Sequence, residues 1–132
     1  RIFMGEKDFQ QLFLIKKFIE SNFKSKIIPC KTIRNKNKLA LSSRNLLLNK
    51  KDLIKAGKIS KELISFKKKL SKKNFTNKII RLKKNELEKF YGIKIEYLEV
   101  RNEKNLQLSK KIKNSRIFLA YYLNNIRLID NF

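Results

Sequence analysis

The stretch that decides the fold is residues 2–12, which read IFMGEKDFQQL. Its three leading apolar residues predict a short strand, and Gly5 breaks the backbone after it. Asp8 and Gln11 are three residues apart, the spacing of a capping box, and they predict the start of an amphipathic helix. We expect this helix to end near Asn22. Its apolar stripe is expected to consist of Leu12, Ile15, Phe18 and Ile19.

Residues 27–30, IIPC, predict a second strand after this helix. Strand, loop, helix and strand in this order form half of a parallel α/β sheet. Ligands of such sheets bind at the carboxyl ends of the strands, which is where Gly5 to Asp8 lie. A polar segment follows, so we place a boundary between a first unit, residues 1–32, and a second unit, residues 33–132.

Two helices are expected in the second unit. Asn49 and Asp52 form another capping pair, which begins a long helix. A weaker helix follows a basic turn at residues 71–74 and ends at Gly92, a typical residue after a helix C-terminus. The long helix is expected to bury Leu53, Ala56, Ile59, Leu63, Phe66 and Leu70, and the weaker helix Phe75, Ile79, Leu82, Leu87 and Phe90.

Strands complete the second unit. Residues 93–101 alternate between apolar and polar side chains, which predicts a half-buried strand. Residues 117–123 and 126–129 flank Asn124-Asn125, and this pair predicts a hairpin because asparagine tolerates positive φ. The second unit is therefore expected to be a small α+β domain.

The composition excludes several kinds of chemistry. The chain of 132 residues has no histidine and a single cysteine, Cys30, so it cannot form an internal disulfide and lacks the usual zinc ligands. Serine triads, Cys–His dyads and histidine general bases all require histidine. We expect any chemistry to depend on positioning, or on histidine supplied from elsewhere, with no metal held by the protein. No apolar run approaches the roughly 18 to 20 residues of a membrane span, so no membrane contact is expected.

The formal charge of +23 favours a nucleic-acid interpretation, because such a field attracts polyanions. The basic residues, however, are 27 Lys and 7 Arg, and the chain is also rich in Asn and Ile, which is the profile of a genome poor in G and C. Nucleic-acid grooves favour arginine for bidentate and stacked contacts. We expect no specific nucleic-acid partner. A small, basic domain that binds nucleic acid nonspecifically remains the alternative function.

Two segments combine small or flexible backbone, hydroxyls and cations, as a nucleotide phosphate site requires. In the first, Gly5 allows close backbone approach, Lys7 offers a positive charge at a helix N-terminus, and Asp8 can accept from ribose hydroxyls. The second is LSSRN, residues 41–45, whose hydroxyls and guanidinium can hold a phosphate chain. From spacing alone, simpler interpretations are favoured: a capped helix with a solvated lysine, and a polar loop before a helix.

Together and in this order, the two segments closely resemble the pantothenate synthetases, also called pantoate–beta-alanine ligases. The blocks that carry the resemblance span nearly the whole chain. They are GEKDFQQL at residues 5–12, TIR at 32–34, LALSSRN at 39–45, EYLEVR at 96–101 and RLIDN at 127–131.

The resemblance implies an α/β fold, in which residues 1–32 are the C-terminal part of a Rossmann-like nucleotide-binding domain and residues 33–132 a small α+β lid domain. It implies an ATP-dependent ligase that condenses pantoate with β-alanine through a pantoyl adenylate, with Mg²⁺ bound alongside ATP. The full-length enzyme is expected to be a cytoplasmic homodimer.

The resemblance also implies roles for individual residues. Gln11 is expected to bind pantoate. Catalysis is expected to depend on Lys7, which contacts phosphate, and on Ser42, Ser43 and Arg44 in a loop that closes over the triphosphate. The residues expected to contact ATP are Gly5, Glu6, Lys7, Asp8, Ile33, Leu41, Ser42, Ser43 and Arg44.

The chain also departs from the family pattern. Family members carry a histidine-containing nucleotide motif near the N-terminus and a further pantoate-binding glutamine, and neither occurs here. Lys31 and Lys38 stand where the family usually has proline and glycine. The chain begins at Arg1 within a predicted strand, which we interpret as an N-terminal truncation, and we expect this fragment alone to be inactive. A degraded fragment that still folds is a third possibility.

Overall fold

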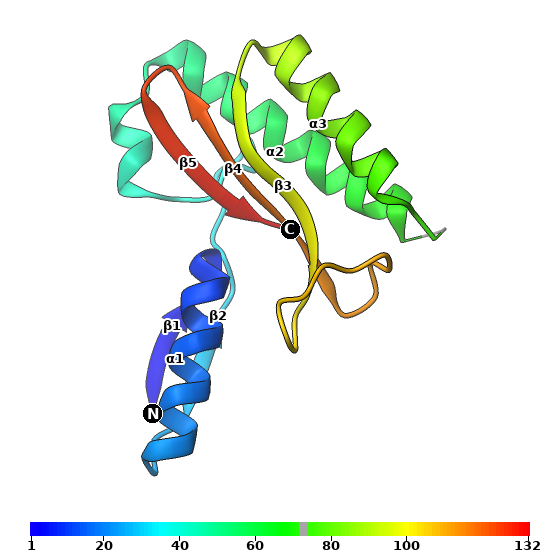
Figure 1. The fold of residues 1–132 in the computed structure, drawn as a ribbon. Helices are drawn as coiled ribbons and strands as arrows, with labels where there is room; N and C mark the ends of the chain where they lie inside the picture. Colours follow the sequence, from blue (N-terminus) through cyan, green and yellow to red (C-terminus); the bar gives the residue numbers. More distant parts are fainter. Residues whose placement is uncertain (72–73) are drawn as a thin grey trace.

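The computed structural model describes residues 1–71 and 74–132. Its first unit is a parallel β–α–β arrangement (Figure 1). Strand β1 pairs in parallel with β2, with Ile2 opposite Ile27, as the sequence predicted. The elements of this unit are β1 (Ile2–Gly5), the 3-10 helix η1 (Glu6–Asp8), α1 (Phe9–Asn22) and β2 (Ile27–Cys30).

Helix α1 ends at the predicted residue but begins without the predicted capping box. Asp8 occupies the N-cap position, yet its side chain accepts no hydrogen bond from the helix. The chain enters α1 through η1, and the carbonyls of Glu6 and Lys7 accept hydrogen bonds from a distant side chain, Asn131. A tertiary contact therefore organises this helix start, and the capping-box prediction was wrong.

Only part of the predicted α1 stripe is covered. Leu12 is buried, whereas Ile15 is 39% and Phe18 60% exposed. The sheet under the helix has two strands, so it cannot cover a stripe of this length.

The helices described in residues 1–71 and 74–132 include none with the length and apolar character of a membrane span.

The second unit is an antiparallel sheet in the order β3-β4-β5, with α2 and α3 on one face (Figure 1). Alternate residues of β4, such as Ile117 and Leu119, point into the core under these helices, because side chains of a strand alternate between faces. The elements are η2 (Ser43–Leu47), α2 (Lys50–Leu70), α3 (Asn77–Tyr91), β3 (Lys94–Asn102), β4 (Ser115–Leu123) and β5 (Ile126–Asn131).

Helix α2 forms as the sequence predicted. The Asn49 side chain accepts a hydrogen bond of 2.9 Å from the Asp52 backbone N–H, which satisfies one free donor of the first turn. The predicted stripe packs into the main core, with Ile59 and Leu63 fully buried and Leu53 and Phe66 partly so.

Helix α3 ends at Gly92 as predicted, and this glycine has the left-handed conformation with φ of 60°. The buried face was predicted only in part. Phe75 and Leu87 are buried as predicted, whereas Ile79, Leu82 and Phe90 are 39%, 56% and 77% exposed, and Ile80, which was not predicted, is buried. Phe75 precedes the helix, so residues spaced at helical intervals from Phe75 do not all lie on the buried face.

The turns agree with the sequence where they are described. Asn124 has a φ of 52° and joins β4 to β5. Strand β3 contains an irregularity between Ile95 and Tyr97 that the alternation did not reveal. Part of the predicted basic turn, residues 72 and 73, lies outside the described residues.

A second, smaller apolar cluster joins the two units. Phe118 of β4 points away from the main core and lies against Phe9, with ring centroids 5.9 Å apart. Leu12 and Ile27 belong to the same cluster. The first unit is therefore packed on the sheet face opposite the helices, at the end where β5 terminates, and this contact brings η1 beside β5.

Candidate functional site

A narrow cleft of about 10 Å³, which has room for about one water molecule, lies between η1, the segment leading into η2, and β5. It contains Lys7 from the first predicted phosphate segment, and Ser42 and Arg44 from the second. The fold thus places cations from both segments on one surface. The full lining is Lys7, Leu39, Ala40, Ser42, Arg44, Asn45, Tyr121, Leu128, Ile129 and Asp130.

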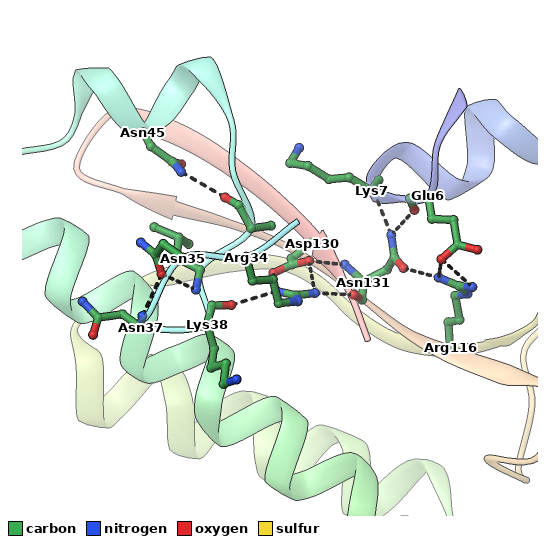
Figure 2. Close-up of polar contacts among 12 residues, drawn as sticks. Glu6, Lys7, Arg34, Asn35, Asn37, Lys38, Asn45, Arg116, Asp130 and Asn131 are labelled. Atoms are coloured by element: carbon green, nitrogen blue, oxygen red, sulfur yellow. Dashed lines mark hydrogen bonds and ion pairs between the residues drawn. The ribbon is translucent and has the colours of Figure 1, made fainter. Parts of the chain in front are cut away.

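Lys7 is held in the cleft by its place in η1. Its side chain is 18% exposed, and its Nζ lies 4.0 Å from a carboxylate oxygen of Asp8. Figure 2 shows this side chain reaching toward Asn45 on the opposite wall. The Lys7 side chain is therefore partly open to solvent at this cleft.

Short-range hydrogen bonds shape the Ser-Ser-Arg loop. Ser42 is extended and its Oγ accepts from the Arg44 backbone N–H at 3.3 Å, which begins η2. The Asn45 side chain donates to the Ala40 carbonyl at 2.9 Å. Because these bonds hold the loop, the exposed side chains of Ser43 and Arg44 project from a defined turn.

The other predicted site residues do not line this cleft. Gly5 ends β1, Asp8 ends η1, and Gln11 lies in the first turn of α1. Glu6 is turned toward Arg116, with a carboxylate oxygen 3.3 Å from Nη2. The two apolar candidates are open to solvent, Ile33 at 71% and Leu41 at 53% exposure.

The polar residues that join the cleft walls were not among the site residues predicted from the sequence. Asp130 and Asn131, at the end of β5, are 6% and 3% exposed. Asp130 binds Arg34 through two hydrogen bonds, and Asn131 contacts η1 (Figure 2). Two polar residues that directly follow an apolar strand are the signal that could have identified them, since buried polar groups require partners.

Burial also changes the acidity of groups in the cleft. Removal of Asp130 from water raises the pKa of its carboxyl, against the opposing effect of the Arg34 guanidinium and the Asn131 backbone N–H. Burial, with the negative charge of Asp130, raises the pKa of Tyr121. Tyr121 is therefore a neutral wall of the cleft near neutral pH.

The side chains that line the cleft can bind an anion and neutralise its charge. An ammonium, a guanidinium and a hydroxyl can hold phosphate oxygens through charge-assisted hydrogen bonds, and the small volume of the cleft means that a polyphosphate would lie across its opening. The carboxylates near the cleft are few: residues 1–71 and 74–132 contain no group of three or more Asp, Glu or Cys side chains able to hold a metal ion.

Solved structures of pantothenate synthetases share the fold of this chain. A pantothenate synthetase structure from Thermus thermophilus matches 98% of this chain and 48% of that chain, with a TM-score of 0.86 and 25% identity. A pantoate-beta-alanine ligase from Francisella tularensis, described as complexed with beta-gamma ATP and beta-alanine, matches with a TM-score of 0.70 and 35% identity, over 98% of this chain and 42% of that one. The mixed α/β fold is thus the one found in part of these ligases.

The model of the pantoate-beta-alanine ligase family matches residues 1–132. A pantothenate synthetase from Flavobacterium psychrophilum is 38% identical over 98% of this chain, and one from Clostridium botulinum is 39% identical over the whole of it. This chain belongs to the pantoate–beta-alanine ligase family. It spans about half the length of these relatives, 47% and 48%.

Proposed function

We propose that this chain supplies the triphosphate-binding side and the lid domain of a ligase that condenses pantoate with β-alanine at the expense of ATP. The observation that carries the proposal is the cleft lined by Lys7 together with Ser42 and Arg44. These residues belong to two segments far apart in the sequence, and both segments are blocks of the family resemblance.

The proposed reaction has two steps. A carboxylate oxygen of pantoate attacks the α-phosphorus of ATP, and the bond to pyrophosphate breaks, which leaves pantoyl adenylate. The amine of β-alanine then attacks the acyl carbon, and AMP departs as pantothenate forms. Negative charge grows on the pyrophosphate in the first step, so fixed cations beside it stabilise the transition state.

The residues of this chain act by positioning. Lys7 and Arg44 neutralise the phosphates, and Ser42 and Ser43 donate hydroxyl hydrogen bonds to them. Gln11 orients pantoate. The remaining nucleotide contacts, to ribose, adenine and backbone, are assigned to Gly5, Glu6, Asp8, Ile33 and Leu41. Mg²⁺ bound with ATP would add to the neutralisation of phosphate charge that Lys7 and Arg44 supply.

The fold supports the view that this site is completed by further polypeptide. Parallel sheets are normally covered on both faces and contain more than two strands. Here β1 and β2 stand alone, and apolar side chains of the first unit, such as Phe3 and Phe18, are 67% and 60% exposed. The chain by itself is therefore proposed to be inactive. The boundary after residue 32 and a homodimeric full-length enzyme are parts of the same proposal.

Adenylate formation tests this function. The chain is fused to the half of the Flavobacterium psychrophilum relative that it does not cover. With pantoate and ATP but without β-alanine, we expect one equivalent of pyrophosphate and of pantoyl adenylate per active site, and AMP only after β-alanine is added. Pyrophosphate release that requires β-alanine from the outset contradicts the two-step reaction.

A further inference from the structure

The end of β5 connects the two walls of the cleft through one dipeptide. Asn131 uses its whole side-chain amide: Nδ2 donates to the carbonyls of Glu6 and Lys7, both at 2.8 Å, and Oδ1 accepts from Arg116 at 3.0 Å. These bonds fix the backbone of η1, from which the Lys7 side chain extends (Figure 2).

Asp130 holds the other wall. Its carboxylate forms two hydrogen bonds with the Arg34 guanidinium, at 2.7 and 2.9 Å. Arg34 also donates to the Asn131 carbonyl at 2.9 Å and to the Lys38 carbonyl at 3.0 Å. The guanidinium thereby closes the turn from Arg34 to Lys38, and the backbone of Arg34 forms a β-bridge with Ala40, which precedes the Ser-Ser-Arg loop.

The two halves of this network are themselves joined. The Asn131 backbone N–H donates to Asp130 Oδ1 at 2.7 Å, so a shift of either residue moves the other. Both residues are buried, and a buried charge-assisted pair has one favourable arrangement because its alternatives leave polar groups unpaired. The dipeptide therefore behaves as a rigid spacer.

We propose that Asp130 and Asn131 are positioning residues that set the separation between Lys7 and the Ser42–Arg44 loop, so that both reach one polyphosphate. The inference rests on the proposed function for the identity of the ligand, and on the hydrogen bonds of β5 for the positioning. Neither residue is required to touch the phosphates.

The isosteric substitution Asp130→Asn distinguishes an effect of positioning on anion binding from an effect of the electrostatic field. It removes a negative charge from the lining of a cationic cleft, so the field alone predicts tighter binding of an anion. Loss of the bidentate contact with Arg34 predicts weaker binding, because the loop is released. The two explanations give changes of opposite sign.

The experiment is a titration of the isotopically labelled 132-residue chain with tripolyphosphate, followed by backbone NMR. We expect the amides of Lys7, Ser43 and Arg44 to report one Kd in the unaltered chain. Asp130→Asn and the charge-neutral Asn131→Ala are each expected to weaken binding about tenfold. The matched control is Asn125→Ala, an exposed residue of the same hairpin, which should leave the Kd unchanged.

Amide hydrogen exchange without ligand completes the test. Asn35 and Leu41 donate backbone hydrogen bonds in the Arg34 turn, and their exchange should accelerate in Asp130→Asn more than that of the α2 core. Equal or tighter tripolyphosphate binding by a folded Asp130→Asn chain overturns the inference. If the unaltered chain shows no shifts with tripolyphosphate, the proposed phosphate site is wrong, and the exchange rates alone decide: acceleration supports the spacer, and unchanged rates overturn it.

Discussion

At the residue scale, Gly57 shows how a backbone contact outweighs helix propensity. It lies within α2, where glycine costs about 1 kcal/mol relative to alanine. A Cβ at this position would lie 2.8 Å from Asn37 Cβ and 3.0 Å from its carbonyl oxygen. The turn that leads into the Ser-Ser-Arg loop is thus packed directly against the helix backbone.

We therefore predict that Gly57→Ala destabilises the fold by about 1 to 3 kcal/mol, the usual cost of overpacking. Urea unfolding monitored by circular dichroism measures the change. Lys58→Ala, at an exposed position of the same helix, is the control and should change the free energy of unfolding by less than about 0.5 kcal/mol. A gain in stability for Gly57→Ala contradicts the contact.

Lys7 and Arg44 give a second prediction at this scale. In the fused enzyme, Lys7→Ala and Arg44→Ala should each slow adenylate formation by about two to three powers of ten, as expected when one electrostatic donor is lost from a transition state. Pantoate binding should change much less. Single-turnover kinetics and pantoate titrations measure the two effects, and unchanged rates for both variants mean that these cations are only solvated.

At the scale of elements, α2 and α3 are joined by a polar cluster of Glu62, Lys83 and Tyr91. Lys83 Nζ contacts one Glu62 carboxylate oxygen, and the Tyr91 hydroxyl donates to the other at 2.8 Å. Burial raises the pKa of Glu62, but these hydrogen bonds outweigh it and hold the pKa below its ordinary value of 4.5. Burial and the Glu62 carboxylate raise the pKa of Tyr91 to about 12.

The lowered pKa of Glu62 fixes the sign of a pH dependence. Its contribution is complete above pH 4.5 and is lost as the pH falls through the folded-state value, because the unfolded chain binds the proton more readily. Glu62→Gln should cost about 1 kcal/mol at pH 7 and flatten the loss of stability in acid. Unfolding titrations from about pH 7 to about pH 3 test this, with exposed Glu20→Gln as the control; an unchanged acid slope in Glu62→Gln contradicts it.

The elements also show what a sequence can and cannot predict. Helix α2, the turn at Asn124 and the C-cap at Gly92 depend on local periods and local conformational preferences, and all three were predicted. The predicted Asp8 cap is absent: the chain enters α1 through η1, whose carbonyls accept hydrogen bonds from Asn131 at the far end of the chain, and the Asp8 side chain accepts none from the helix. The pairing of Asp130 with Arg34 is likewise invisible in a linear pattern, although the two cations of the cleft, Lys7 and Arg44, were recognised as candidates.

At the scale of the whole molecule, the charge of +23 is spread over helix faces, and neighbouring lysines repel one another. We predict that moderate salt raises the melting temperature, since ions screen exposed charges over about 10 Å at roughly 0.1 M. Binding to nucleic acid should be nonspecific and should disappear as salt rises, because it depends on released counterions.

Thermal melts, and titrations with fluorescent single-stranded and duplex oligonucleotides of different sequence, measure these effects at low and physiological salt. Binding that distinguishes sequences at submicromolar concentration and survives physiological salt contradicts the ligase account and favours a dedicated nucleic-acid-binding domain.

The central claim is that this chain contributes one side of a ligase site which further polypeptide completes. The direct measurement is AMP and pantothenate formation from ATP, pantoate and β-alanine, by the 132-residue chain alone and by the fusion with the uncovered half of the Flavobacterium psychrophilum relative. We predict no AMP above the ATP blank from the chain alone, and equal amounts of AMP and pantothenate from the fusion. Robust turnover by the chain alone, or a folded fusion without activity, contradicts the account.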